Sequence, residues 1–207
     1  MAFIKQQTTQ SVAKDERKKA RTCPDLIAGL EDPNPVARRW MARDLAAFPG
    51  AASALVDRLK REDDLSVREV ILTTLARIGD PAAVGALVEC LRSDDAALRN
   101  EVIETMKQLP EEVAPIMRGL LADGNSDLRI FAVNILETLR HPDVERWLIG
   151  VIEGDPQVNV CAVAADLLSE VGTEAATEAL VRLKGRFGDE PYIQFTADLA
   201  LKRIREA

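Results

Sequence analysis

The residue types that most often bind metals or act as nucleophiles are scarce in this chain. Its 207 residues include one histidine, His141, and three cysteines, Cys23, Cys90 and Cys161. A zinc site needs about four such ligands close together, often in CxxC pairs, whereas these residues are widely spaced. Reduced cysteines on apolar helix faces act as small hydrophobic residues, and His141 precedes a proline in a turn, where we expect it to be solvated or bonded to a carbonyl. We therefore predict no metal site.

Other motifs that carry chemistry are missing from the sequence as well. It contains neither GxxxxGK[ST] nor a GxGxxG after a strand, so nothing indicates a phosphate-binding loop. The 34 acidic residues are spread along the chain. A solvated acidic surface explains them better than a paired general acid and base. We predict no catalytic residues and no cofactor.

What recurs instead is a spacing of apolar residues. Anchor residues follow one another every 30 to 33 positions, at Ala37, Val67, Leu98, Leu128, Val160 and Ile193. Further apolar residues stand eight and eleven positions after each anchor, at Leu45 and Phe48, Leu75 and Ile78, Met106 and Leu109, Leu136 and Leu139, Leu168 and Val171, and Leu201 and Ile204. These offsets form one stripe of a helix, which neighbouring helices must cover. A period of this length is typical of a solenoid.

Turns rich in Asp, Gly and Pro divide the chain into pairs of helices. We predict an all-α fold, a right-handed α-solenoid of about six helix pairs. Its units span about 24–48, 51–79, 81–109, 111–140, 142–172 and 173–205, within a repeat domain of residues 23–207. Residues 1–22 form a basic, polar leader that either contacts an acidic partner or is simply solvated.

An arginine follows the anchor in each of the first four units, at Arg38, Arg68, Arg99 and Arg129. Acidic residues precede the same helices, at Asp32, Asp64, Asp94 and Asp127, where a short acidic side chain can cap the helix. Each arginine can reach the acidic turn of an adjacent unit. Because the series has the period of the fold, we interpret it as a structural ladder.

The net charge and the lengths of the apolar runs limit which partners and which cellular location we expect. The net charge is −7, and the body of the chain is acidic, which argues against general nucleic-acid binding. No apolar run approaches the roughly 20 residues that span a bilayer, and the N-terminus lacks the apolar core of a secretory signal. We expect a cytoplasmic protein without a membrane span.

The segment DDLSVREVILTTLARIGDPAAVGALVECLRSDDAALR resembles HEAT repeats of the short, phycobilisome-lyase HEAT-like subtype. The resemblance covers residues 24–205 and is strongest over 63–140. It weakens in the last two units, where Asn159, Cys161 and Gln194 depart from the pattern, as suits the end of an array. HEAT-like iron hydroxylases rely on repeated His-Glu pairs, which one histidine cannot supply. HEAT-like DNA glycosylases have a basic groove, to which only Arg39 and Arg43 would contribute here.

In arrays that resemble this one, the second helix of each pair lines the concave face. Residues two and six positions after the anchors then form a strip along that face, which we call the second-helix strip. It contains Arg39, Arg43, Glu69, Thr73, Asn100, Glu104, Ile130, Asn134, Asp166, Phe195 and Leu199. The strip begins basic, becomes polar and acidic, and ends apolar. Phe195 and Leu199 either mark an interaction site or fold under the last unit.

The sequence therefore predicts a non-catalytic scaffold or adaptor that binds a protein partner along the second-helix strip. The alternative comes from the resemblance alone, because enzymes of this subtype attach or detach bilin chromophores on antenna proteins. It is a bilin or tetrapyrrole lyase, or a lyase-type chaperone subunit.

Overall fold

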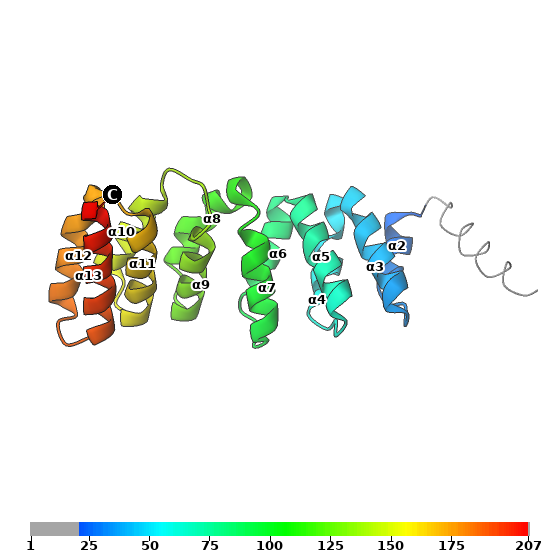
Figure 1. Cartoon of the computed structure of the whole chain (residues 1–207). Coiled ribbons are helices and arrows are strands. Elements are labelled where there is room, and N and C mark those ends of the chain that lie inside the picture. Colours follow the sequence, from blue (N-terminus) through cyan, green and yellow to red (C-terminus); the bar gives the residue numbers. More distant parts are fainter. Residues whose placement is uncertain (1–20, 207) are drawn as a thin grey trace, which may run out of the picture.

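The computed structural model describes residues 21–206, and all regular structure in this range is helical, as predicted. The first helices of the pairs are α2 (Cys23–Gly29), α4 (Ala52–Leu59), α6 (Pro81–Cys90), α8 (Pro110–Leu121), α10 (Val144–Gly154) and α12 (Thr177–Arg186). The second helices are α3 (Pro35–Asp44), α5 (Leu65–Ile78), α7 (Ala96–Met106), α9 (Ser126–Leu136), α11 (Val158–Val171) and α13 (Pro191–Glu206). The pairs follow one another in a single elongated row (Figure 1).

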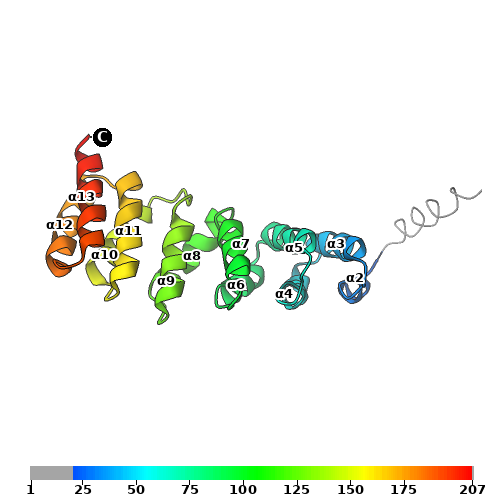
Figure 2. The same ribbon diagram turned by 60° about the horizontal axis from the view of Figure 1, so that its bottom comes forward.

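The helices form two layers. Each first helix packs on the second helix of its own pair, and each second helix also packs on the next second helix along the array. Figure 2 shows the two rows, with α3, α5 and α7 on one side and α2, α4 and α6 on the other. The first layer is less continuous, because α8 and α10 make little contact with each other. The second helices therefore form the continuous face of the solenoid.

The core lies between the layers and follows the predicted stripe. Every residue eight positions after an anchor is buried, from Leu45 to Leu201. The residues eleven positions after the anchors are covered less evenly. Leu109 and Leu139 are buried, whereas Val171 is 37% exposed because it is the last residue of α11. One continuous apolar core connects all the pairs. This explains why the spacing of apolar residues recurs from unit to unit although the residue types change.

Local sequence sets where the helices begin and end. The second helix of the first pair ends at Asp44, earlier than predicted, and short 3₁₀ turns over Leu45–Ala47 and Pro49–Ala51 follow it. Phe48 leaves the helical region, with φ −128° and ψ 85°, as expected for a residue that precedes a proline. Gly79 ends α5 with φ 59°, a left-handed conformation that favours glycine. The first helix of the last pair starts at Thr177 after a 3₁₀ turn over Glu174–Ala176.

The predicted leader lies almost entirely outside the described residues. Where the description begins, Thr22 caps α2 through a reciprocal capping box with Asp25. Within residues 21–206, no helix is long and apolar enough to cross a membrane.

Candidate protein-binding face

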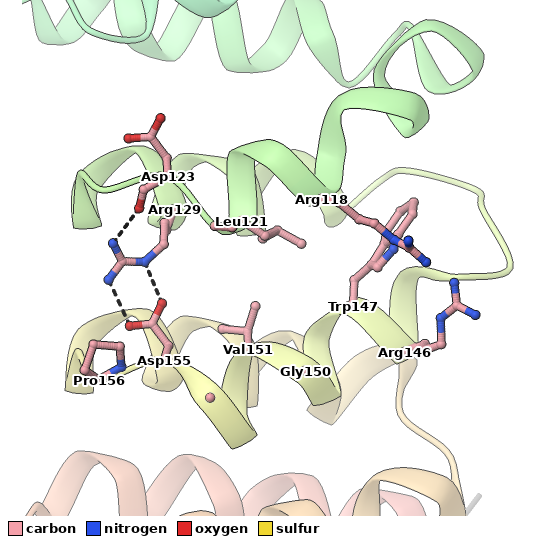
Figure 3. A pocket seen from close by; sticks show the side chains of 12 residues that line it. Arg118, Leu121, Asp123, Arg129, Arg146, Trp147, Gly150, Val151, Asp155 and Pro156 are labelled. Atoms are coloured by element: carbon pink, nitrogen blue, oxygen red, sulfur yellow. Dashed lines mark hydrogen bonds and ion pairs between the residues drawn. The ribbon is translucent and has the colours of Figure 1, made fainter.

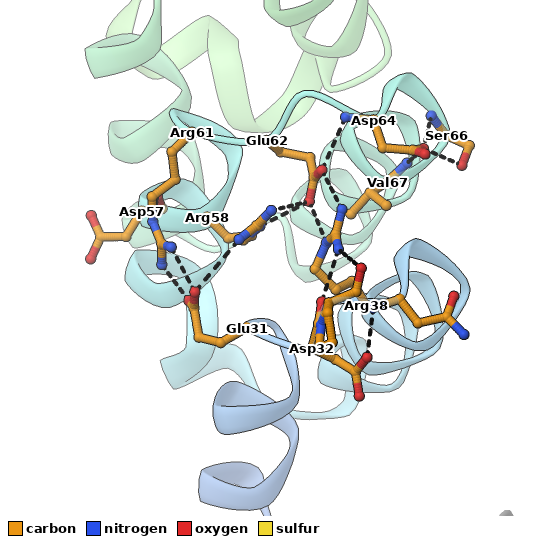
Figure 4. Close-up of polar contacts among 12 residues, drawn as sticks. Glu31, Asp32, Arg38, Asp57, Arg58, Arg61, Glu62, Asp64, Ser66 and Val67 are labelled. Carbon is orange, nitrogen blue, oxygen red and sulfur yellow. Dashed lines mark hydrogen bonds and ion pairs between the residues drawn. The ribbon is translucent and has the colours of Figure 1, made fainter.

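A buried ion pair joins the first two units and fixes α3 against the turn before α5. Arg38 donates from Nε and Nη2 to the two carboxylate oxygens of Glu62, at 2.8 and 2.7 Å. Glu62 also accepts from Arg58 at 2.8 Å and from the backbone N–H of Asp64 at 3.0 Å (Figure 4). The remaining Nη1 of Arg38 donates to the carbonyl of Asp32. The carboxylate is therefore buried but fully bonded.

Two later arginines of the series also bridge consecutive units. Arg68 in α5 contacts Asp95 at 3.1 Å and Glu101 at 3.0 Å, both in the third unit. Arg129 in α9 binds both carboxylate oxygens of Asp155, at 2.6 and 2.9 Å, in the turn before α11. Bidentate contacts of this kind restrict both distance and orientation. They set the spacing of the second helices, and hence of the strip that those helices carry.

Arg99 departs from this arrangement. Its Nη1 donates to the carbonyl of Ser93 in its own unit at 2.6 Å, and its guanidinium lies 5.5 Å from the centre of the Phe131 ring. Among residues 21–206, no carboxylate lies within ion-pair distance of Arg99. The acidic residue of the facing turn, Asp123, is instead paired with Arg92 at 2.6 Å.

This difference predicts a small effect for Arg99→Ala. The substitution removes one hydrogen bond to a carbonyl and a ring contact, so we expect the free energy of unfolding to fall by about 1 kcal/mol. Urea unfolding followed by circular dichroism measures it, with Arg39→Ala as the control, because Arg39 is exposed on α3. A loss of several kcal/mol would show that Arg99 carries a buried ion pair after all.

The residues that cap the second helices differ from the sequence expectation at three of the four predicted positions. Asp64 caps α5 as expected, but Asn34, Asp95 and Asn125 cap α3, α7 and α9 in place of Asp32, Asp94 and Asp127. A cap must immediately precede the first helical residue, so that its side chain reaches the N–H two or three residues on. Asp32 accepts instead from the backbone N–H of Asn34, inside the turn.

The pKa of Glu62 reflects its surroundings. Burial raises it, but the hydrogen bonds from Arg38, the backbone of Asp64 and Arg58 outweigh that effect and lower the pKa from 4.5 to about 2. A carboxyl with a lowered pKa stabilises the fold above the pKa of the unfolded chain, and that contribution is lost as the pH falls towards the folded pKa. For Glu62 this window lies between 4.5 and about 2.

We therefore expect the difference in unfolding free energy between the unmodified chain and Glu62→Gln to depend on pH. It should be largest above about pH 5 and shrink by about 1.4 kcal/mol per pH unit on acidification, because a protonated Glu62 resembles glutamine. Urea unfolding at a series of pH values measures this difference directly. A difference that stays constant from about pH 6 to about pH 3 would contradict the lowered pKa.

The structure places the second-helix strip on α3, α5, α7, α9, α11 and α13. Two of its segments line grooves between neighbouring second helices. The first groove, of about 470 Å³ between α5 and α7, is lined by strip residues Glu69, Thr73, Asn100 and Glu104. The second, of about 160 Å³ between α9 and α11, includes Asn134 and Asp166. The strip is thus hollowed where its residues are polar and acidic.

The two ends of the strip differ from this middle part. At the first unit Arg39 and Arg43 are exposed, and Arg43 also contacts Asp44 and the ring of Trp40. At the last unit Phe195 is 63% exposed and Leu199 is half-buried. Ile130 is partly buried against the core, so it offers less apolar surface than the sequence suggested.

Sequence reasoning missed several residues of this face. Tyr192, 58% exposed, precedes Phe195 and Leu199 by three and seven positions, a helical spacing that could have indicated one apolar face. Leu65, 69% exposed, borders the groove between α5 and α7. Lys107 pairs with Glu137 of the next unit at 2.6 Å, and opposite charges one period apart are the signal that could have revealed it.

The three cysteines and His141 lie in the helical framework, where each packs or bonds within the fold. Cys23, Cys90 and Cys161 are free and lie on α2, α6 and α11, and burial raises the pKa of the last two thiols. The ring nitrogen Nδ1 of His141 accepts a hydrogen bond from the backbone N–H of Asp143 at 3.1 Å. Its ring stacks on Trp147 with the centroids 4.9 Å apart. In the described range no group of three or more His, Cys, Asp or Glu residues could hold a metal ion.

The architecture and its ladder of inter-unit contacts define a helical-repeat protein, and comparison with known families specifies which one. The model of HEAT repeats matches residues 23–107, 52–127 and 113–202. The chain therefore belongs to the HEAT-repeat family.

Two relatives share parts of the sequence. The bilin biosynthesis protein PecE of Nostoc sp. is 38% identical over 74 residues, which make up 35% of this chain and 29% of PecE. A HEAT repeat-containing taxis protein of Halobacterium salinarum is 31% identical over 154 residues, 64% of this chain and 38% of that protein. The chain thus spans well under half the length of either relative.

Two solved structures are similar to this chain over most of its length. The archaeal HEAT-like repeats protein of Thermococcus onnurineus is 12% identical with a TM-score of 0.45, and the match covers 97% of this chain and 94% of that one. The complex of CpcE and CpcF of phycocyanin lyase from Nostoc sp. is 19% identical with a TM-score of 0.36, covering 91% and 95%.

Proposed function

We propose that this chain is a cytoplasmic, non-catalytic scaffold that binds a protein partner along the second-helix strip. The observation that carries the proposal is the coincidence of the strip with the grooves on the continuous face of the solenoid. Extended faces of this kind suit protein binding, because a rigid array displays many modest contacts at once. The ion pairs between units hold those contacts at fixed spacing.

The order of charged and apolar residues along the strip indicates which kind of partner segment would fit it. Arg39 and Arg43 favour an acidic segment at the first unit, whereas the middle grooves carry Glu69, Glu104 and Asp166 and favour basic or amide side chains. At the far end Phe195 offers an apolar anchor. The partner segment would therefore run along the array with its acidic end at α3 and its apolar end at α13.

Affinity purification from cells of the source organism tests this proposal. The unmodified chain should capture a protein that the folded double variant Arg39→Glu, Arg43→Glu captures more weakly. In purified form that variant should associate more slowly, and its rate should depend differently on salt, because exposed charges steer encounters. Equal capture and equal association rates would remove the first unit from the binding face.

A second candidate function is that of a bilin lyase or a lyase-type chaperone subunit, and the similarity to PecE favours it. A protein with that function would bind a bilin and change the visible absorption spectrum of the pigment. Mixing the purified chain with a linear tetrapyrrole and recording the spectrum separates the two functions. An unchanged spectrum together with capture of a protein partner supports the scaffold.

A further inference from the structure

A separate cavity lies between two first helices, on the opposite layer from the second-helix strip. Since α8 and α10 make little contact, they leave a pocket of about 490 Å³ between them (Figure 3). Its middle is apolar, with Leu121 from α8 and Val151 from α10 facing each other. A side chain added at Gly150 or Gly154 would meet nothing within 4 Å, so these glycines keep the α10 wall open. The size falls within the range of about 300–1,000 Å³ that is usual for small-molecule sites.

At one end of the pocket the charged side chains are paired with each other. There Arg129 binds both carboxylate oxygens of Asp155 and donates to the carbonyl of Asp123 at 2.8 Å. The side chain of Asp123 is in turn paired with Arg92. The charge of Arg129 at this end is therefore already matched by a carboxylate.

The other end carries three donor groups, two of which have no acceptor within residues 21–206. Arg118 from α8 is exposed and makes no ion pair or hydrogen bond within residues 21–206. Arg146 from α10 is exposed, and its one ion pair within residues 21–206 is with Asp143, the residue before α10, at 2.9 Å. Trp147 is 9% exposed, and its indole N–H is buried with no hydrogen-bond partner in the described part of the chain. Figure 3 shows these three side chains gathered at the same end of the pocket.

A buried N–H without an acceptor costs free energy, on the order of 1–3 kcal/mol, which a bound acceptor would recover. Two guanidinium groups beside it favour an oxyanion, and guanidinium forks match the planar carboxylate. The apolar walls favour a hydrocarbon body attached to that carboxylate. The Arg118 side chain is exposed, and no hydrogen bond or ion pair within residues 21–206 holds its guanidinium, so it is free to reorient towards a bound carboxylate.

We propose that the pocket between α8 and α10 binds an apolar carboxylate. The carboxylate lies among Arg118, Arg146 and Trp147, and the hydrocarbon body lies between Leu121 and Val151. Such a group can come from a free organic acid or from the C-terminal carboxylate of a peptide with apolar last residues. The site lies apart from the second-helix strip, so a test of one does not decide the other.

Tryptophan fluorescence tests the site with defined probes. The chain has two tryptophans, so Trp40→Phe leaves Trp147 as the reporter. Octanoate and a hexapeptide with a free C-terminal leucine represent the two sources, and octanamide and the amidated hexapeptide are their uncharged counterparts. We expect at least one carboxylate to change the Trp147 emission at saturation, with its uncharged counterpart binding about tenfold or more weakly. Octanoate alone would identify a free acid, and the peptide alone a C-terminus.

Two variants then locate the binding. Gly150→Leu fills the pocket and should abolish the response, whereas Gly119→Leu, on the groove between α6 and α8, should leave it unchanged. Arg118→Gln should weaken binding of the carboxylate about tenfold without altering helical content. The proposal is overturned if neither carboxylate binds, if the uncharged counterparts bind equally well, or if a folded Gly150→Leu variant responds like the unmodified pocket.

Discussion

Glu62→Gln is expected to lower the free energy of unfolding by about 3–5 kcal/mol at neutral pH. The substitution keeps the shape of the side chain but leaves the buried guanidinium of Arg38 without its counter-charge. It also removes one of the two carboxylates that pair with Arg58. The lowered pKa of Glu62 comes from the same contacts and has the direction that such a cost requires. Urea unfolding followed by circular dichroism measures the change.

Glu31→Gln is the matched control. Glu31 pairs with Arg61 and Arg58 across the same two units, but it is exposed, so its loss should cost less than about 1 kcal/mol. Equal costs for the two substitutions would mean that burial does not distinguish the two ion pairs. This result would contradict the claim that the buried pairs set the spacing of the second helices.

Phe195→Ser combined with Leu199→Ser is expected to raise the dissociation rate of the captured partner about tenfold or more, with a smaller change in association. An apolar anchor that becomes desolvated on binding mainly holds a complex together, whereas exposed charges mainly steer its formation. Neither residue is fully buried, so the helical content should persist. Surface plasmon resonance with the purified partner measures both rates.

Val181→Ser is the control for this pair of substitutions. Val181 is 56% exposed in the same unit, but it lies on α12 in the other layer. It should therefore leave both rates unchanged. If Val181→Ser accelerates dissociation and the α13 variant does not, the partner binds the first helices.

The fold was predictable because stacking depends on a period, and a period is visible in a single sequence. The residues eight positions after the anchors, from Leu45 to Leu201, are buried in every unit, and the helix pairs match the predicted order. Helix ends were harder to predict, because capping depends on which of two neighbouring polar residues precedes the first helical turn. At α7 that residue is Asp95 rather than Asp94.

The candidate site was predictable only in part. Helical periodicity places Glu69 and Asn100 on one face, but it does not reveal that the space between α5 and α7 is hollow. Arg99 resembles Arg129 in sequence, yet Asp123 is paired with Arg92, and this competition between pairs exists only in three dimensions. The splaying of α8 from α10 likewise depends on how whole helices pack, so no local pattern indicates the pocket beside Trp147.

The central claim is that a protein partner binds the second-helix face, and site-specific photo-crosslinking in cells of the source organism tests it most directly. A photoreactive amino acid would replace Asn100 on α7 or Glu89 on α6, which are both exposed in the same unit but lie in different layers. The account predicts that the probe at position 100 crosslinks to the partner recovered by affinity purification and that the probe at position 89 does not. Crosslinking from position 89 alone would contradict it.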